Sequence, residues 1–536
     1  MIKCETVTKK RSGDILFCPS VRYNMCKINQ NTHKPNALVY VLVNERERVM
    51  KLKRTLAVVL ALGIVLGVAG CGKKGTSSSS GETIHWYISK CSENTSSKDA
   101  VMKEANKIIE KELGVTLELH LIDMGNYDEK MRTMLATREE MDICFIRTAD
   151  QYLTGVKNGS FIELTDELLE KHCPDILAKN SDYEWKLAEV DGKLWGIKGQ
   201  GPLADNPSMV FKKDLVEKYN FDYKSVKSLA DLEPYLETIK QNEPNIYPLL
   251  YQTPDTTSTR FTDSNITGLI YDEEKQEYIS ELEAESLLTR WETKHKYYQK
   301  GYIPKDANTR SEYLTECKSG NYAVMCNTGY YSEDGSKATA AYGFPCVETS
   351  MGVRPIITKS GSINCISSTS KNSGKALEVL NLIWKDPYLH NTLAYGVEGI
   401  DYTIDEKRSA EIGEKSVIPN SGNMQTWCIW HNWLGPLWQQ WDSGWNRREA
   451  LDQMRELNET AAISSALGFK FDPENVKTEY AKVSSVRNEY DKVFNTGCME
   501  NYEEYLSDAR KKMKNAGIDA VIAEVNKQFK QWQKNN

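Results

Sequence analysis

The spacing of apolar positions predicts alternating strands and helices in the first part of the chain. Residues 83–89 and 115–121 alternate apolar and polar positions as strands do, and residues 142–146 form a short apolar strand. Helical patterns lie between these strands, at residues 97–113 and 126–135. This β-α-β-α-β order is typical of a mostly parallel sheet with helices on both faces. Ligands bind such sheets beyond the carboxyl ends of the strands, so the residues after each strand are candidates for a site.

A second alternating section follows a hairpin and a loop. Asp191-Gly192 is a turn signal inside a predicted hairpin, and the next residues, 199–207, are rich in glycine and proline. We expect a lobe boundary in this loop. Beyond it the pattern predicts strands at residues 209–211, 247–251, 322–326 and 363–367, helices at residues 214–219, 229–240, 292–299 and 373–385, and a helical tail from residue 474.

An apolar run before the first strand has the pattern of an export signal. Basic residues follow Met50, an apolar segment spans residues 56–69, and Val68-Ala-Gly-Cys71 is similar to the lipobox of bacterial lipoproteins. The run is short for a membrane span, and a serine-rich tether follows it. A buried core helix is the alternative, but it would carry a polar face. We expect a lipidated Cys71 that anchors the chain to the outer face of the cytoplasmic membrane.

This interpretation divides the amino-terminal part of the chain into three segments. Residues 50–70 are the expected lipoprotein signal peptide and residues 71–81 the tether. A signal peptide works near the amino terminus, so we interpret residues 1–49 as a misassigned upstream extension.

Composition removes several function classes. The 536 residues carry a formal net charge of -7, which provides no basic field for nucleic acid. The thirteen cysteines include no CxxC pair, so a zinc-cysteine site has little support. No HExxH, GxSxG or P-loop motif occurs. We expect no cofactor and no enzymatic activity, while a hydrolase that uses a pair of carboxylates stays open as an alternative.

The order of several short motifs resembles the extracellular solute-binding lipoproteins of bacterial ABC importers, of the type that binds sugars and oligosaccharides. The motifs are the lipobox, Trp195-Gly-Ile197, Met209-Val-Phe-Lys-Lys-Asp-Leu215, Gly320-Asn-Tyr-Ala-Val-Met325, Ser370-Lys-Asn372 with Lys375-Ala376, and Tyr395-Gly-Val-Glu-Gly-Ile-Asp-Tyr402. The resemblance covers most of residues 50–536, and the last motif is similar to a segment of large Gram-positive binders.

The resemblance implies a two-lobed, periplasmic-binding-protein-like α/β fold that closes over a ligand like a hinge. The tail after Ser416 departs from the shorter binders, and its pattern predicts an extra helical carboxyl-terminal region. Lobe 1 is expected at residues 82–197 plus 362–394, and lobe 2 at residues 198–361 plus 395–536. A monomer is expected, which delivers a carbohydrate to the permease subunits of an ABC importer. A surface adhesin is a further alternative, although no repeat of fixed period is visible.

The candidate ligand contacts are aromatic and polar residues near the ends of predicted strands, two tryptophans of the tryptophan-rich segment 427–445, and one glutamate that could bind a hydroxyl group. Indole and phenol rings stack on the apolar faces of sugars, and polar neighbours bind the hydroxyl groups. Each candidate has a structural alternative, such as packing in the core or capping of a helix. The candidates are Trp86, Tyr87, Gln151, Tyr152, Tyr330, Tyr331, Glu398, Trp427 and Trp430. Trp438, Trp441 and Trp445 have helical spacing and are expected in the core.

One segment has the spacing of a calcium loop. Asp263, Asn265, Thr267 and Glu274 fit positions 1, 3, 5 and 12 of the twelve-residue loop, with Gly268 at position 6. A surface turn is the alternative, because the preceding segment is a poor helix.

Overall fold

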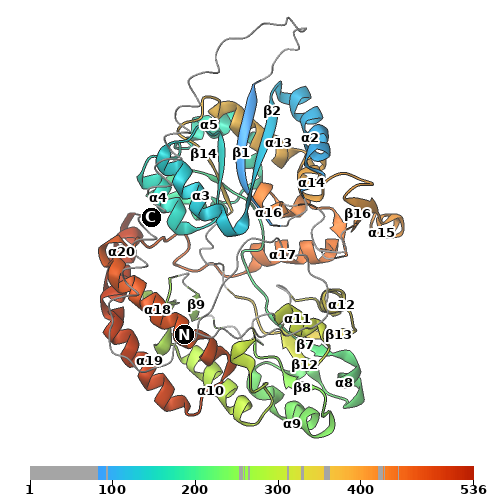
Figure 1. Cartoon of the computed structure of the whole chain (residues 1–536), viewed down its shortest axis with the longest axis vertical. Helices are drawn as coiled ribbons and strands as arrows, with labels where there is room; N and C mark the ends of the chain where they lie inside the picture. The colour runs from blue at the N-terminus through green and yellow to red at the C-terminus, as the bar shows by residue number, and fades with distance from the viewer. Residues whose placement is uncertain are drawn as a thin grey trace, which may run out of the picture. The chain divides into compact units, whose positions relative to one another are not determined.

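The computed structural model describes residues 82–535, except residues 92–94, 253–257, 259, 264–265, 311–312, 327–330, 355, 357–361, 421–426, 428 and 445 (Figure 1). The expected signal peptide, the tether and Cys71 lie outside the described residues, as do Asn265 and Tyr330. Within the described part, none of the helices combines the length and apolar character needed to cross a membrane.

The first sheet has the strand order β2-β1-β3-β14-β6. Strands β1 (Thr83–Lys90), β2 (Thr116–Asp123) and β3 (Ile143–Ile146) are parallel, as the alternating pattern predicts. Two strands from later in the chain, β14 (Ile363–Ile366) and β6 (Ile197–Lys198), add to the sheet in antiparallel pairings. This α/β architecture confirms the predicted fold class.

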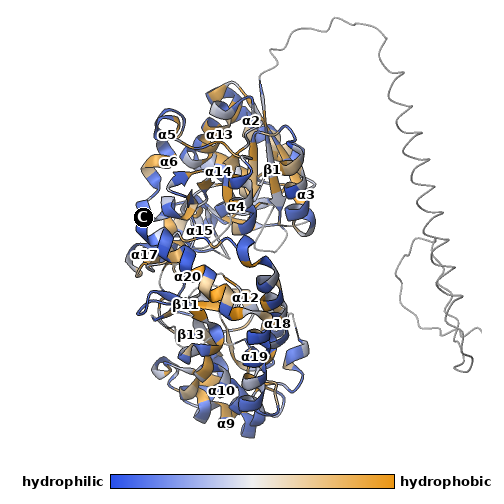
Figure 2. Ribbon diagram, turned by 90° about the vertical axis from the view of Figure 1, so that its left-hand side faces the viewer, coloured by the Kyte–Doolittle hydropathy of each residue, from blue (hydrophilic) through white to orange (hydrophobic). Residues whose placement is uncertain are grey.

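Helices cover this sheet on both sides, and α3 lies across β1 from α13 and α14 (Figures 1 and 2). Their bounds are α2 (Lys98–Leu113), α3 (Met124–Thr137), α4 (Ala149–Lys157), α5 (Asp166–His172), α6 (Pro174–Lys179), α7 (Asp182–Ala188), α13 (Ser373–Lys385) and α14 (Pro387–Tyr395). Helix α2 buries Val101, Ala105 and Ile109 along one face and ends at Gly114, whose φ of 70° favours glycine. Helix α3 begins two residues before the predicted start at residue 126, directly after β2.

The second sheet has the strand order β13-β7-β12-β8. Its strands are β7 (Ser208–Lys212), β8 (Tyr247–Leu249), β12 (Tyr322–Cys326) and β13 (Cys346–Ser350), and its helices are α8 (Lys213–Lys218), α9 (Glu233–Asn242), α10 (Glu285–Gln299), α11 (Tyr313–Lys318) and α12 (Ser336–Tyr342). The predicted hairpin before this lobe forms from β4 (Glu189–Val190) and β5 (Lys193–Leu194), with φ of 52° at Asp191 and 70° at Gly192.

The tail forms a third core of its own. Helices α18 (Lys477–Thr496), α19 (Tyr502–Ala516) and α20 (Ile518–Asn535) pack with the small sheet of β9 (Phe261–Asp263), β10 (Leu269–Asp272) and β11 (Glu277–Ser280). Hydrophilic and hydrophobic residues alternate along these helices (Figure 2). The predicted apolar stripe of α20 is buried at Val521, Val525 and Phe529.

The segment between these bodies contains short elements and returns to the first core. The elements are β15 (Tyr402–Ile404), α15 (Glu406–Ile412), β16 (Ser416–Pro419), α16 (His431–Leu434), the 3-10 helix η5 (Leu437–Gln439), β17 (Asp442–Ser443) and α17 (Arg448–Thr460). Trp427 and Trp433 join the apolar core of the first sheet, although residues 395–536 are expected in lobe 2. The Trp433 ring lies 4.9 Å from that of Phe145 in β3, because this face of the strand needs an apolar cover.

Two linker segments cross beside each other where the chain leaves the first sheet. Gln200 N–H donates to the carbonyl of Gly435, and Leu437 N–H donates back to the carbonyl of Gln200, both at 3.1 Å. A Cβ at Gly199 would lie 1.9 Å from the Asn432 carbonyl oxygen, so this crossing requires glycine.

The side chain of Asn458 ties helix α17 to the linker. Its Oδ1 accepts from Leu203 N–H at 2.8 Å and from Ala204 N–H at 3.1 Å, and its Nδ2 donates to the Gly201 carbonyl at 2.9 Å. Asn458 is 4% exposed, so water does not replace these partners.

Asn458→Ala should lower the free energy of unfolding by about 2 to 4 kcal/mol, because it leaves two buried N–H groups without an acceptor. Urea unfolding followed by circular dichroism measures the change. Asn242→Ala is the control, since Asn242 bonds only the exposed end of its own helix. An Asn458→Ala protein as stable as the control would contradict the assigned role.

Candidate functional site

The carboxyl end of β3 carries a cluster of polar side chains. Thr148 caps helix α4 by accepting from Gln151 N–H at 3.3 Å, so the chain turns away directly after the strand. Arg147 Nη1 donates to the Met124 carbonyl at 2.9 Å, and its Nε lies 3.8 Å from Asp128 Oδ1. A cation from the loop after β3, a carboxylate from α3 and an amide from α4 therefore lie together at the edge where parallel sheets bind ligands.

Two of these side chains present buried acceptors that lack a donor. Asp128 Oδ1 and Gln151 Oε1 have no hydrogen-bond partner among the described residues. The Gln151 amide is oriented by a 3.4 Å bond from Nε2 to the Asp128 carbonyl. Buried acceptors without a hydrogen bond are costly, so a donor that reaches them, such as water or the hydroxyl group of a ligand, is favourable.

An exposed indole lies at the same edge of the sheet. Trp433 is buried against Phe145, the third of four residues in β3, and the Trp430 ring lies 5.0 Å from the Trp433 ring. Trp430 is 38% exposed and directly precedes α16. The structure thus brings Gln151 and Trp430, both predicted from the sequence, to the end of the same strand.

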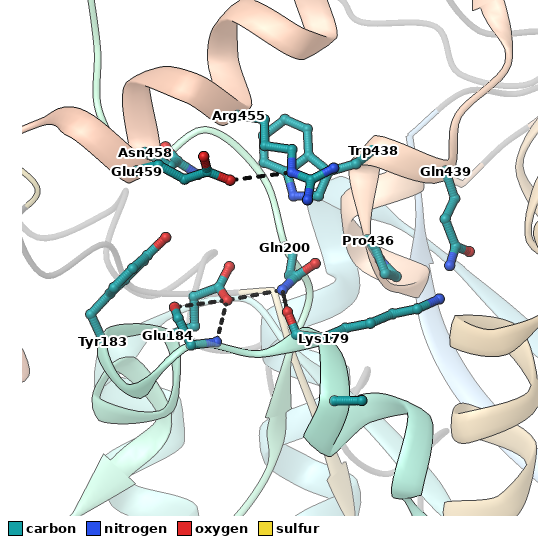
Figure 3. Close-up of a pocket in the computed structure, with 12 residues that line it drawn as sticks. Lys179, Tyr183, Glu184, Gln200, Pro436, Trp438, Gln439, Arg455, Asn458 and Glu459 are labelled. Carbon is teal, nitrogen blue, oxygen red and sulfur yellow. Dashed lines mark hydrogen bonds and ion pairs between the residues drawn. The ribbon is translucent and has the colours of Figure 1, made fainter.

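A hollow of about 550 Å³ lies between α6 and α7 on one side and α17 on the other (Figure 3). Its size is within the range of pockets for small molecules. Aromatic side chains, Tyr183 and Trp438, line it together with polar groups. The remaining lining residues are Ala178, Lys179, Ser181, Glu184, Gln200, Pro436, Gln439, Arg455, Asn458 and Glu459.

The floor of this hollow is a preorganised polar network. Gln200 Nε2 donates to Glu184 Oε2 at 2.9 Å, and that carboxylate also accepts from Ser181 N–H at 2.9 Å (Figure 3). Burial raises the pKa of the Glu184 carboxyl, while these donors lower it. On the opposite wall Arg455 pairs with Glu459 at 3.4 Å. Polar groups of both signs between aromatic rings suit a neutral, hydroxyl-rich ligand.

The sequence did not predict this hollow. The spacing of Ser181 and Glu184 is a visible capping-box signal for α7, but it says nothing about α17. The spacing of Trp438 and Trp441 predicts a shared helical face, but the short helix η5 ends at Gln439 and the chain is extended at Gln440. Trp438 lines the hollow, whereas Trp441 packs against Tyr395 and Tyr402. Trp445 lies outside the described residues.

Three predicted contacts lie in the core. Trp86, Tyr152 and Trp427 are 0% exposed. Alternation in β1 turns Trp86 inward, and the Tyr152 hydroxyl donates to the Ala188 carbonyl at 2.5 Å. The structure therefore removes these three residues from the candidate site, because they present no surface to a ligand.

The other predicted contacts lie apart from one another. Tyr87 is on the opposite face of β1, where its ring stacks on His120 at 4.2 Å. Tyr331 is half-buried near the second sheet, and its N–H donates to the Asn206 carbonyl. The Glu398 carboxylate is exposed and pairs with Lys415 at 3.3 Å.

The predicted calcium loop is a piece of sheet. Asp263 ends β9 and pairs with Ile270 in β10, while Glu274 follows β10 and pairs with Arg260 at 3.2 Å. Strand β10 separates Thr267 from Glu274 by about 10 Å at the usual rise per residue. This corrects the expectation from the sequence, because paired strands keep positions 5 and 12 from facing one cation.

Comparisons with known proteins agree with this architecture. A carbohydrate ABC transporter substrate-binding protein of Streptococcus pneumoniae serotype 4 is 26% identical over 492 residues, which covers 88% of this chain and 97% of the relative. The crystal structure of the N-glycan transport solute binding protein NgtS from Streptococcus pneumoniae matches with a TM-score of 0.70 and 25% identity, covering 85% of this chain and 99% of that one.

The chain is thus similar over most of its length to a substrate-binding protein of an ABC transporter and to a solute-binding protein of N-glycan transport. NgtS in complex with Man5GlcNAc matches with a TM-score of 0.60 and 25% identity, over 85% of this chain and 99% of that one. Residues 465–534 match the model of a domain of unknown function, DUF3502. The names of these relatives describe substrate- or solute-binding proteins of transport, which agrees with the binding role expected from the motifs.

A buried histidine pair supports the segment that carries Trp430. The rings of His390 in α14 and His431 in α16 are stacked 5.3 Å apart. Burial lowers the pKa of His390 to about 3, and it lowers the pKa of His431 well below its usual value. Both pKa values are lower in the folded state than in the unfolded state, so at low pH the unfolded chain binds protons that the folded chain does not. The free energy of unfolding is therefore highest above pH 6.5 and decreases as the pH falls below this value.

The free energy of unfolding of the wild type decreases between pH 7.5 and pH 5. In His390→Leu this decrease should be smaller by about 2 kcal/mol, because one proton-binding site of the unfolded chain is removed. Unfolding at both pH values, compared with the wild type, measures the difference. An equal loss of stability in the variant and the wild type would contradict the buried neutral state of His390.

Proposed function

We propose that this chain is a lipid-anchored, extracellular solute-binding protein that captures an oligosaccharide and delivers it to an ABC permease. The observation that carries the proposal is the similarity to a carbohydrate substrate-binding protein and to NgtS over at least 85% of the chain. Because NgtS was crystallised with Man5GlcNAc, glycans of mannose and N-acetylglucosamine are the first ligands to test.

The candidate site supports a sugar as the ligand. The exposed Trp430 indole offers an apolar face to the C–H groups of a sugar ring. The unpaired acceptors of Asp128 and Gln151 are suited to sugar hydroxyl groups, and Arg147 is a donor beside them. None of these groups requires a charged ligand, which favours a neutral glycan.

The protein captures its ligand because the closed arrangement of the two lobes binds the ligand more tightly than the open arrangement does. A ligand that contacts both sheets binds the closed arrangement better and shifts the population toward it. The linkers that cross at Gly199 and Gly435 are the place for the hinge. The permease then recognises the closed form, and the lipid on Cys71 keeps the protein next to it.

Trp430→Ala should weaken glycan binding at least about tenfold, because the stacking face is lost without disturbing the core. Isothermal titration calorimetry with glycans of mannose and N-acetylglucosamine measures the affinity. Tyr388→Ala is a matched control, since Tyr388 is 51% exposed and lies in α14. Unchanged affinity in Trp430→Ala would exclude this indole from the site. A wild type that binds no glycan would contradict the proposed function.

Cys71→Ala should release the protein from the membrane into the medium, because the acceptor of the lipid is removed. Cell fractionation and labelling with an alkyne analogue of palmitate detect the anchor. Cys91→Ala is the control, because Cys91 lies past the predicted tether and outside the lipobox motif. Labelling that persists in Cys71→Ala would place the lipid elsewhere.

A further inference from the structure

Two histidines and a glutamate lie together on the first two strands of the chain. His85 in β1 is directly opposite Glu118 in β2, and Tyr87 is opposite His120. His85 Nδ1 lies 3.0 Å from His120 Nε2 and 3.5 Å from Glu118 Oε2. His120 Nε2 lies 3.9 Å from Glu118 Oε1. Within the described part of the chain, this is the group of side chains whose ligand atoms are close enough to share a metal ion.

Strand geometry places these three side chains on one face. Alternation turns Ile84 and Trp86 of β1 into the core together with Leu119 of β2, so the residues between them face the other way. Pairing along the whole of β1 and β2 fixes the backbone of all three residues. A site on paired strands needs little ordering when an ion binds.

The spacing of the ligand atoms fits a divalent transition metal. Zinc binds histidine nitrogen and carboxylate oxygen at about 2.0 to 2.2 Å, which places neighbouring ligands of a tetrahedral site about 3.3 Å apart. The observed separations of 3.0, 3.5 and 3.9 Å surround this value. Two imidazoles with one carboxylate are also a donor set that zinc, copper and nickel prefer over calcium or magnesium.

The surroundings leave the cluster accessible and the imidazole ready to bind. The side chains of His85, Glu118 and His120 are 41%, 51% and 28% exposed, so an ion and a water molecule can reach them. Tyr87 stacks on the His120 ring and holds its plane.

We propose that His85, Glu118 and His120 bind one divalent transition-metal ion, of the zinc class, with the remaining coordination position open to solvent. The site lies on the exposed face of β1 and β2, at the third residue of β1 and the third and fifth residues of β2, whereas the proposed sugar site lies beyond the carboxyl end of β3. The proposal therefore does not depend on the proposed function, and either can fail alone.

Zinc chloride titrated into chelator-treated protein should show one ion bound per chain by isothermal titration calorimetry. His85→Ala and His120→Ala should each weaken zinc binding at least about tenfold, since each removes a ligand. Glu118→Gln keeps the shape of the side chain but removes the charge, and we expect weaker binding there too. His295→Ala is the control: it removes a half-buried histidine of α10 outside the cluster and should leave zinc binding unchanged.

A spectroscopic test identifies the ligands directly. The electron paramagnetic resonance spectrum of added Cu²⁺ should show coupling to two imidazole nitrogens in the wild type and to one in His85→Ala. Near-ultraviolet circular dichroism checks that each variant is folded. No zinc uptake by the wild type, or equal uptake by folded His85→Ala and His120→Ala, would overturn the proposal.

Discussion

Burial of both faces of the central strands of the first sheet is the constraint on which the candidate sugar site depends. All four residues of β3 and all four of β14 are buried. An apolar strand stays out of water only if other segments cover each face. The first helices do not supply all of this cover, so the chain returns with Trp427 and Trp433 from far along the sequence. Because Trp430 lies between these two tryptophans in the sequence, it is placed near the carboxyl end of β3.

The segment that carries these tryptophans also contributes to the linkers between the lobes of the molecule. The backbone of residues 199–201 passes against that of residues 432–437, close enough that Gly199 has no room for a side chain. Asn458 then attaches α17 to the next residues of the linker. The hollow between α7 and α17 is thus bounded by segments that the linkers hold, and its shape is expected to respond to movement of the lobes.

The carboxyl end of β3 and the exposed face of β1 and β2 carry different chemistry. The carboxyl end of β3 has an indole, an amide and a carboxylate, which suits a neutral ligand rich in hydroxyl groups. The exposed face of β1 and β2 has two imidazoles and a carboxylate, which suits a metal ion. A rigid sheet separates the two groups, so neither needs the other to keep its geometry.

Local patterns in the sequence determined the elements. The alternation at residues 115–121, the helical stripe at Val101, Ala105 and Ile109, and the Asp-Gly turn all report backbone preferences within a few residues. The prediction of Gln151 used the same local information together with the rule that ligands bind at strand ends, whereas Trp430 was predicted from the density of tryptophans at residues 427–445. Trp86 and Tyr152 satisfied this reasoning equally well, yet both are buried.

Tertiary structure decided what depends on contacts between distant segments. Whether an aromatic ring is exposed follows from what covers it, as the return of residues 427–434 shows for Trp427 and Trp430. The wall of the hollow opposite α7 comes from α17, more than two hundred residues later in the sequence. The histidine cluster likewise depends on the register of β1 with β2, because a shift of one residue would turn Glu118 and His120 to the other face. Sequence periodicity determines which side of a helix or strand is apolar, but only the tertiary packing determines which segment that side packs against.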